Sequence, residues 1–282
     1  KGLGQLRGER VLGVTRPSSG PARTAALAVG AVGVAAGIWG IGIERHLYTL
    51  RRHTVAVLAP GSAPIRVLHI SDVHMAPWQR RKQAWIASLA SLRPDLIINT
   101  GDNLGHPDGL RGLRAAFAGF RGTPGAFVHG SNDLYAPAPR NPLRYFRGPS
   151  EHTGGEVRLD TEALDAFFTN TLGWQDVNNA AASIDIHGRR VNLIGVDDAH
   201  RDWGRLDLLP GLFDHLRARD SDLDGDGHAD AEADPDPLTV AVTHAPYRRG
   251  SGPAPCGGRA PVLCAPPPRG RPARPPPPPP PP

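Results

Sequence analysis

The sequence predicts an α/β protein built on a largely parallel sheet, and two observations lead to this fold class. Three apolar segments of strand length, residues 67–70, 95–99 and 126–129, are separated by stretches with helical periodicity. Strands that alternate with helices are typical of βαβ units. Each apolar segment also runs directly into a short loop rich in Gly, Asp and Asn. Because sites form at the carboxyl ends of strands in open α/β sheets, these loops predict one polar site.

The chain starts with a basic flank, residues 1–24, and an apolar run, residues 25–43. The run has nineteen residues without a charge, which is long enough to cross a bilayer. A membrane anchor is the favoured interpretation, with a cleaved signal or a soluble helix as the alternatives. Basic residues exceed acids before the run, so the positive-inside rule predicts an extracytoplasmic position for the residues beyond it. Arg51 and Arg52, just after the run, oppose that orientation.

After a linker over residues 44–65, the main domain is expected over residues 66–249. Residues 136–160 are rich in Pro, Arg and Gly and predict a long surface loop that shapes access to the site. The expected helices are residues 80–92, 110–120 and 161–172, and the later strands are residues 182–186, 190–196 and 238–243, of which the first two form a hairpin.

The net charge of +5 does not indicate a nucleic-acid partner, because the excess of basic residues lies at the two ends of the chain. Without residues 1–23 and those after Tyr247, 21 basic and 26 acidic residues remain. The strands and loops also lack a stripe of Arg and Lys with interleaved aromatics. Both cysteines, Cys256 and Cys264, lie near the C-terminus, so the sequence supports neither a disulfide framework nor a thiolate zinc site.

Residues 220–234 are strongly acidic and partly match a calcium-binding loop. Asp222, Asp224 and Asp226 stand at its first, third and fifth positions, but Ala233 occupies the twelfth. The twelfth position normally supplies a bidentate carboxylate, so a solvated acidic loop is favoured over a specific calcium site.

Residues 250–282 contain fifteen prolines and no apolar periodicity, so a disordered tail is expected. One interpretation is a polyproline II segment that binds a partner. The favoured interpretation is a non-native tail produced by a shifted reading frame.

Four short motifs come after the expected strands. Asp72-x-His74 follows the first strand, Gly101-Asp102-Asn103 the second, Gly130-Ser131-Asn132-Asp133 the third, and His244-Ala245-Pro246 the last. Together, in this order and at strand ends, they resemble the calcineurin-like metallophosphoesterase superfamily, in particular its bacterial branch with an N-terminal anchor or signal. The resemblance extends over about residues 67–247 and implies the βαβ sandwich of that family.

The resemblance implies a hydrolase with two divalent metal ions of the Mn, Fe, Zn or Co class. Asp72 and His74 would bind the first ion, His244 would bind the second, and Asp102 would bridge them. A metal-bridging hydroxide would attack the phosphorus of a phosphomonoester or phosphodiester. Lipid-linked phosphoesters are among the candidate substrates. Asn103, next to the bridging residue, would either support the site from behind or contact the substrate.

The chain departs from the family pattern in two places. The third motif is usually Gly-Asn-His followed by an acid, whereas Ser131 and Asn132 stand here in place of Asn and His. Either the loop is shifted so that Asn132 binds the metal, which we favour, or Ser131 contacts the metal weakly. Ser131 and Asp133 are otherwise expected to contact the substrate or to support the metal ligands from behind. The family also ends its site with Gly-His-x-His, and no histidine follows His244. The fold is therefore expected to lack its last strands.

Three functions are open on this basis. They are a metal-dependent phosphoesterase, a catalytically impaired remnant or binding protein of the same fold, and an interaction protein that acts through its Pro-rich tail. Asp198 and His200, which follow the strand over residues 190–196, fit metal ligands and pocket-wall residues equally well. The sequence predicts no particular oligomeric state.

Overall fold

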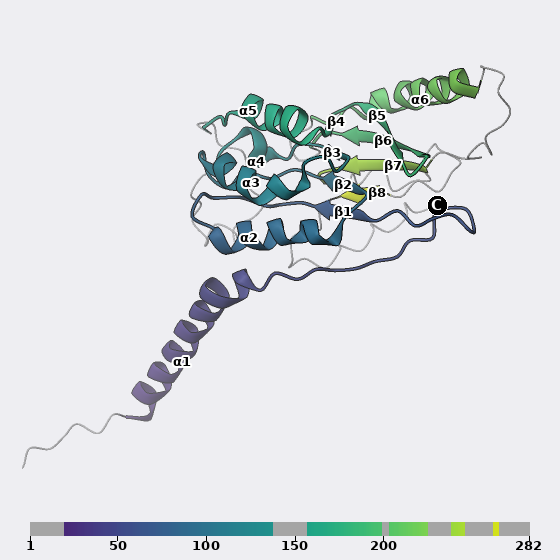
Figure 1. The fold of residues 1–282 in the computed structure, drawn as a ribbon. Helices are drawn as coiled ribbons and strands as arrows, with labels where there is room; N and C mark the ends of the chain where they lie inside the picture. Colours follow the sequence, from purple (N-terminus) through teal and green to yellow (C-terminus); the bar gives the residue numbers. More distant parts are fainter. Residues whose placement is uncertain (1–19, 138–156, 199–202, 225–237, 246–261, 265–282) are drawn as a thin grey trace, which may run out of the picture. The chain divides into compact units, whose positions relative to one another are not determined.

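The computed structural model describes residues 20–137, 157–198, 203–224, 238–245 and 262–264 of the 282-residue chain (Figure 1). His200, most of the expected loop over residues 136–160 and most of the Pro-rich tail lie outside these ranges. The chain divides into two compact units, Lys1–Arg51 and Arg52–Pro282, each of which is considered by itself.

The first unit contains one long apolar helix. α1, Pro21–Ile38, continues through a π-helical turn, Trp39–Ile43, and a 3₁₀ turn, Glu44–His46. Proline suits the first position of α1, where its missing N–H has no helical partner to lose. The most apolar window of the whole helical segment has a mean hydropathy of 2.0, and none of it is buried within the structure. By length and composition the segment is able to cross a membrane, as either an anchor or a signal does.

Four parallel strands form the first sheet, in the order β1-β2-β3-β4. Side chains alternate between its two faces: Ile97 packs toward the helices, whereas its neighbours Leu96 and Ile98 belong to the core between the two sheets. Helices α2, α3 and α5 cover the outer face (Figure 1). The strands are Val67–Ile70, Leu96–Asn99, Gly125–Phe127 and Gln175–Asp176, and the helices are Arg80–Ser88, Gly109–Phe117 and Thr161–Ala166. The predicted parallel βαβ arrangement is confirmed.

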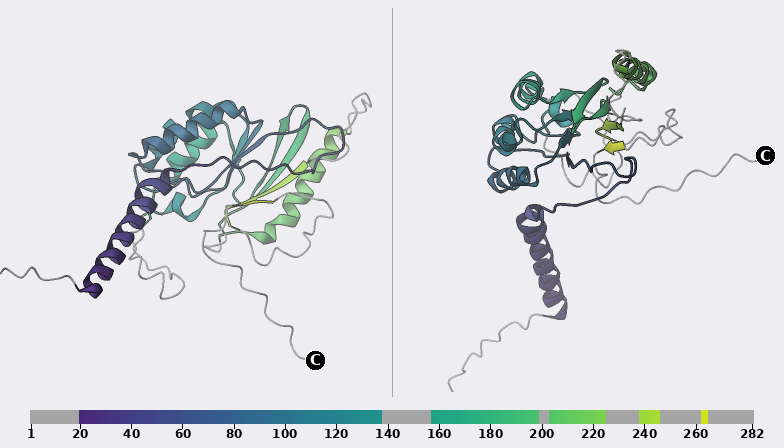
Figure 2. Two further views of the ribbon diagram at one scale, coloured as in Figure 1. Left: turned by 90° about the horizontal axis from the view of Figure 1, so that it is seen from below. Right: turned by 45° about the vertical axis from the view of Figure 1, so that its right-hand side comes forward.

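The second sheet has the order β5-β6-β7-β8. β5 and β6 form the predicted hairpin, and its turn residues His187 and Gly188 both have positive φ, as a two-residue type I′ turn requires. β6, β7 and β8 run parallel to one another. α6 packs on β5 and β6, on the side away from α2, α3 and α5 (Figure 2). The strands are Ala181–Ile186, Arg189–Val196, Leu238–Thr243 and Val262–Cys264, and α6 is Leu209–Asp224.

The structure contains four elements that the sequence did not predict: α4 (Ser131–Leu134), β4, α6 and β8. β8 is a correction, because the sequence predicts a tail without secondary structure there, and the strand pairs its backbone with β7. α6 is a second correction, because Asp222 and Asp224 lie in this helix rather than in an acidic loop. Asp226 and the rest of the expected calcium loop lie outside the described residues. The third strand ends at Phe127, two residues earlier than expected.

Short helical segments follow α2, α3 and α5 and complete the lengths of the predicted helices. They are the 3₁₀ turns Leu89–Leu92 and Ala118–Phe120 and the π-helical segment Phe167–Leu172. A further 3₁₀ turn, Leu206–Leu208, precedes α6. The polar loops after β1, β2 and β3 therefore lie at one edge of the first sheet, since all three strands are parallel.

Candidate metal centre

The loops after β1 and β2 hold their polar residues in an unusual backbone conformation. Asp72, His74 and Asp102 have φ angles of 51°, 40° and 55°, in the left-handed region that residues other than glycine seldom adopt. Backbone hydrogen bonds join the loops: the N–H groups of Asp72, His74 and Met75 donate to the carbonyls of Gly101, Asp102 and Asn103 at 3.0, 2.9 and 2.7 Å. Each left-handed residue costs roughly 1–3 kcal/mol, and such residues cluster at functional sites.

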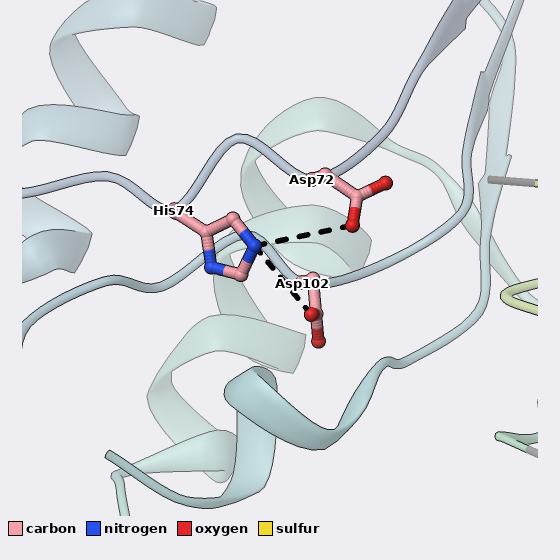
Figure 3. A group of neighbouring side chains, drawn as sticks. All are labelled: Asp72, His74 and Asp102. Carbon is pink, nitrogen blue, oxygen red and sulfur yellow. Dashed lines mark ion pairs between the residues drawn. The ribbon is translucent and has the colours of Figure 1, made fainter. Parts of the chain in front are cut away.

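This backbone brings the side chains of Asp72, His74 and Asp102 together (Figure 3). His74 Nε2 lies 3.9 Å from Asp72 Oδ1 and 3.6 Å from Asp102 Oδ2. The three ligand atoms all lie within 4.8 Å of one another, a spacing that suits one cation between them. The side chains of Asp72 and His74 are 37% and 43% exposed, so the centre opens to solvent on this side.

His244 reaches the same carboxylate from the second sheet. It follows β7 directly and is buried, and its Nδ1 lies 2.6 Å from the Thr100 carbonyl oxygen, to which it donates. Its Nε2 lies 3.8 Å from Asp102 Oδ2. Asp102 therefore stands between two imidazole nitrogens that come from different sheets. This is the position that the resemblance assigns to a bridging carboxylate.

The charges around His244 favour a cation. Burial by itself lowers the pKa of this imidazole, but the Asp102 carboxylate, the hydrogen bond to the Thr100 carbonyl and the carboxylates of Asp198 and Asp72 together raise it. The same negative potential stabilises a metal ion at this position, because both the proton and the ion carry positive charge.

The donor set fits divalent transition-metal ions. The two imidazole–carboxylate distances around Asp102 are 3.6 and 3.8 Å, longer than the hydrogen bonds such groups form when they contact each other directly. Imidazole nitrogens and carboxylate oxygens that face one another across such a gap are the ligands preferred by Mn, Fe, Zn and Co rather than by Mg or Ca. Asp72, His74, Asp102 and His244 are thus the residues able to hold metal here.

Asn132 lies against the central carboxylate. Its backbone N–H donates to Asp102 Oδ1 at 2.8 Å, and its side-chain Nδ2 donates to Asp102 Oδ2 at 2.7 Å. This close approach depends on Gly130, because a Cβ on that residue would lie 2.3 Å from Asp102 Oδ1. The structure therefore places Asn132 beside Asp102, next to the other predicted ligands.

Asp133 and Asn103 lie behind the centre rather than at its surface. Both are fully buried. Asp133 Oδ1 accepts a hydrogen bond from the Asn103 N–H at 2.7 Å, and its Oδ2 accepts one from the Gly130 N–H at 3.1 Å. Burial raises the pKa of Asp133, although His129 and these backbone donors act in the opposite direction. The pair joins the loops that carry Asp102 and Asn132.

The remaining predicted residues differ in their placement. Asp198, two residues beyond β6, is fully buried and affects the centre through its charge on His244. Ser131 is half-buried and begins α4, next to Asn132. His200 lies outside the described residues.

The structure adds two supporting residues that the sequence did not single out. Asn99, the last residue of β2, exchanges two amide hydrogen bonds with Asn103, at 2.8 and 3.0 Å. Thr100 accepts the His244 hydrogen bond through its carbonyl and contacts His69 Nε2 through Oγ1 at 2.9 Å. A polar residue at the end of an otherwise apolar strand is the signal that identifies Asn99.

His129 forms a separate pair with Asp165 of α5, at 2.7 Å between Nε2 and Oδ1. Burial lowers the pKa of His129, but the hydrogen bond to Asp165 and the charges of Asp133, Asp165 and Asp176 outweigh burial and raise it. His129 thus ties the loop after β3 to α5 through its hydrogen bond to Asp165. The imidazole is engaged away from the metal ligands.

The stability that His129 contributes is expected to depend on pH. Its pKa in the folded protein lies above the unfolded value of 6.5, so the contribution is complete below that pH and is lost as the pH rises through the folded pKa. Urea unfolding of wild type and of His129→Gln should show a larger difference in unfolding free energy at pH 5.5 than at pH 8.5. An equal difference at both pH values would contradict the raised pKa. Asp165→Asn, which removes the partner charge, should weaken the same dependence.

Comparisons with known proteins identify a family for this chain. The model of the family described as calcineurin-like phosphoesterase matches residues 65–261. Among solved structures, the crystal structure of AQ665, a protein of unknown function from Aquifex aeolicus, is 13% identical, with 71% of this chain and 89% of that chain covered and a TM-score of 0.28. The chain matches no curated protein. The family match spans more than half of the chain and includes every strand-end motif, and the chain therefore belongs to the calcineurin-like phosphoesterase family.

Proposed function

We propose that this protein is a metal-dependent phosphoesterase that hydrolyses a phosphomonoester or a phosphodiester at the centre around Asp102. One observation carries the proposal: imidazole nitrogens of His74 and His244, from two different sheets, both lie within 4 Å of the same Asp102 oxygen. A carboxylate held between two imidazoles suits a pair of divalent ions, which when bound polarise a phosphoryl oxygen and activate water.

Each residue has a definable task in this proposal. Asp72 and His74 would hold one ion, His244 the other, and Asp102 both. The hydrogen bonds from Asn132 orient the two oxygens of Asp102, because one donor approaches each oxygen. The half-exposed side chains of Asp72 and His74 leave the substrate one open direction, whereas buried His244 and Asp102 keep bulk water out behind them.

The third motif limits the substrates to esters whose leaving group departs readily. Asn132 stands where relatives of the family carry a histidine, and His129 is bonded to Asp165, so this loop places no imidazole near the leaving group. Without a general acid, hydrolysis depends more strongly on the acidity of the departing alcohol. We therefore propose that aryl esters react much faster than alkyl esters.

The absence of Gly-His-x-His after His244 supports a second candidate, a catalytically impaired member of the family that binds metal. The apolar helix Pro21–His46 supports a membrane-anchored protein with an extracytoplasmic domain and access to lipid-linked phosphoesters.

We also propose that the Pro-rich tail binds a protein partner. Pull-down with the full chain and with a chain that lacks residues 250–282 tests this.

The test of the main proposal is hydrolysis by the purified full chain. With added Mn²⁺, the protein should release nitrophenolate from bis-p-nitrophenyl phosphate, and a chelator should stop the reaction. Zn²⁺ or Co²⁺ should restore activity after chelation, whereas Ca²⁺ should not, because the centre contains imidazole ligands. Tight Mn²⁺ binding without turnover would instead support the impaired binding protein.

A further inference from the structure

The outer surface of α2 and α3 carries basic residues, and neither helix contains an acidic residue. The sequence has no Asp or Glu from Val73 to Pro94 and none from Gly109 to Asn132. The two helices lie side by side on the same sheet (Figure 1), and a Cβ on Gly112 would lie 2.7 Å from Gln83 Nε2. Their outward side chains therefore form one surface. Its exposed basic residues within the two helices are Arg80, Arg81, Arg111 and Arg114.

These four arginines retain their charge for an outside partner. None of them forms an ion pair with a described residue. Arg114 lies over the ring of Phe167, 5.8 Å from its centroid, which orders the side chain without neutralising it. The acids that flank the two helices along the chain are Asp72 and Asp95 for α2 and Asp108 and Asp133 for α3, and Asp108 faces His106. The basic surface is thus bordered by acids but not mixed with them.

Trp78 stands at the end of this surface that lies beside the metal centre. Its side chain is 64% exposed, which is unusual for so large an apolar residue. The edge of His106 packs on its ring, with the centroids 4.9 Å apart. Trp78 comes four residues after His74, and His106 comes four residues after Asp102, so the aromatic pair continues the two ligand-bearing loops. We call Trp78 and the four arginines the arginine face.

An exposed Trp beside several arginines matches the composition of surfaces that bind the headgroup region of anionic bilayers. The same chain contains an apolar helical segment, Pro21–His46, that is long enough to cross a bilayer. Only residues 47–66 separate it from β1, a reach of at most about 70 Å when fully extended. A domain on such a tether stays close to a lipid surface, so its arginines are within reach of anionic lipid headgroups.

We infer that the arginine face docks on the surface of a bilayer that contains anionic lipids, with Trp78 in the headgroup region. Docking through this face brings the exposed side of Asp72 and His74 toward the phosphoesters of the lipid surface. The contact itself does not depend on hydrolysis, so it stands or falls separately from the proposed activity.

Fluorescence quenching of Trp78 tests the contact in the full-length chain. The protein is reconstituted into vesicles that contain brominated lipids, with or without phosphatidylglycerol. The difference in quenching between wild type and Trp78→Phe isolates Trp78 from the other tryptophans. With anionic lipid, this difference should be large, and Arg80→Gln/Arg81→Gln/Arg111→Gln should reduce it by at least about threefold. Arg205→Gln/Arg217→Gln, which removes two exposed arginines elsewhere, should leave it unchanged.

Three results would overturn the inference. One is equal quenching of wild type and Trp78→Phe, which places Trp78 away from lipid. Another is an equal loss in the two arginine variants, which makes the effect one of net charge alone. The third is binding of a short DNA duplex that the triple variant abolishes while lipid quenching persists, which assigns the face to nucleic acid. Thermal melting of each variant, expected to match wild type, excludes unfolding as the cause.

Discussion

In the proposed two-metal centre, replacing Asp102 by Ala is expected to reduce metal-dependent hydrolysis by about a thousandfold and to abolish binding of one of the two ions. The reason is the position of its carboxylate. Asp102 Oδ2 is the atom shared by His74 and His244, at 3.6 and 3.8 Å, and no other carboxylate of the described residues lies between those imidazoles. Without it, two cations would face each other with no negative charge between them.

Asp102→Asn separates charge from shape. The amide keeps one oxygen and much of the contact with Asn132, so the fold should survive, but the lost charge should still weaken metal binding strongly. Calorimetric titration with Mn²⁺ and hydrolysis of bis-p-nitrophenyl phosphate measure the two effects. Asp108→Ala is the matched control, because Asp108 is an exposed aspartate six residues along the same loop. Unchanged Mn²⁺ affinity in Asp102→Ala would reject the assigned centre.

The sequence predicts the position of the centre better than its shape. β1 and β2 are short apolar strands that end in polar loops, and this pattern is local, so the ligands Asp72, His74 and Asp102 are found from it. The left-handed backbone of all three is not predictable in this way, because none of them is glycine. Hydrogen bonds between the two loops impose that conformation, and those bonds exist only after the strands have paired.

Elements held by distant partners are also hard to predict. β4 has two residues and exists because its backbone pairs with β3, and β8 exists because Val262–Cys264 pairs with β7. α4 has four residues and is held at its start by the buried Asp133 carboxylate rather than by helical periodicity. The same limit applies to the contact between His244 and Thr100, which joins residues 144 positions apart.

Total charge is a poor guide to surface charge in this fold. Between the two termini the chain has more acids than bases, yet α2 and α3 present arginines and α5 presents acids. The net charge of the whole chain averages over surfaces of opposite charge, each of which a partner would contact separately. Only the packing of α2 beside α3 shows that their basic residues share one surface.

Replacing Gly130 by Ala is expected to damage both the fold and the centre. Its φ of −112° is open to any residue, so the backbone conformation itself would not be strained. The added Cβ, however, would lie 2.3 Å from Asp102 Oδ1 and 2.8 Å from both Asp102 Cγ and the Asp102 backbone nitrogen. Because backbone is among the atoms struck, a side-chain rotation cannot relieve the overlap. We expect a loss of about 2–3 kcal/mol in unfolding free energy, together with much weaker Mn²⁺ binding.

Gly122→Ala is the control, because it introduces backbone strain without steric overlap, whereas Gly130→Ala introduces overlap without backbone strain. Gly122 has a φ of +79° and no atom within 4 Å of the added Cβ, so alanine there meets conformational strain and no overlap. It should cost about 1 kcal/mol and leave Mn²⁺ affinity unchanged. Urea unfolding and Mn²⁺ titration of both variants decide the matter. If Gly130→Ala behaved like Gly122→Ala, Asp102 would have room to move, and a carboxylate with that freedom could not be the fixed point between His74 and His244.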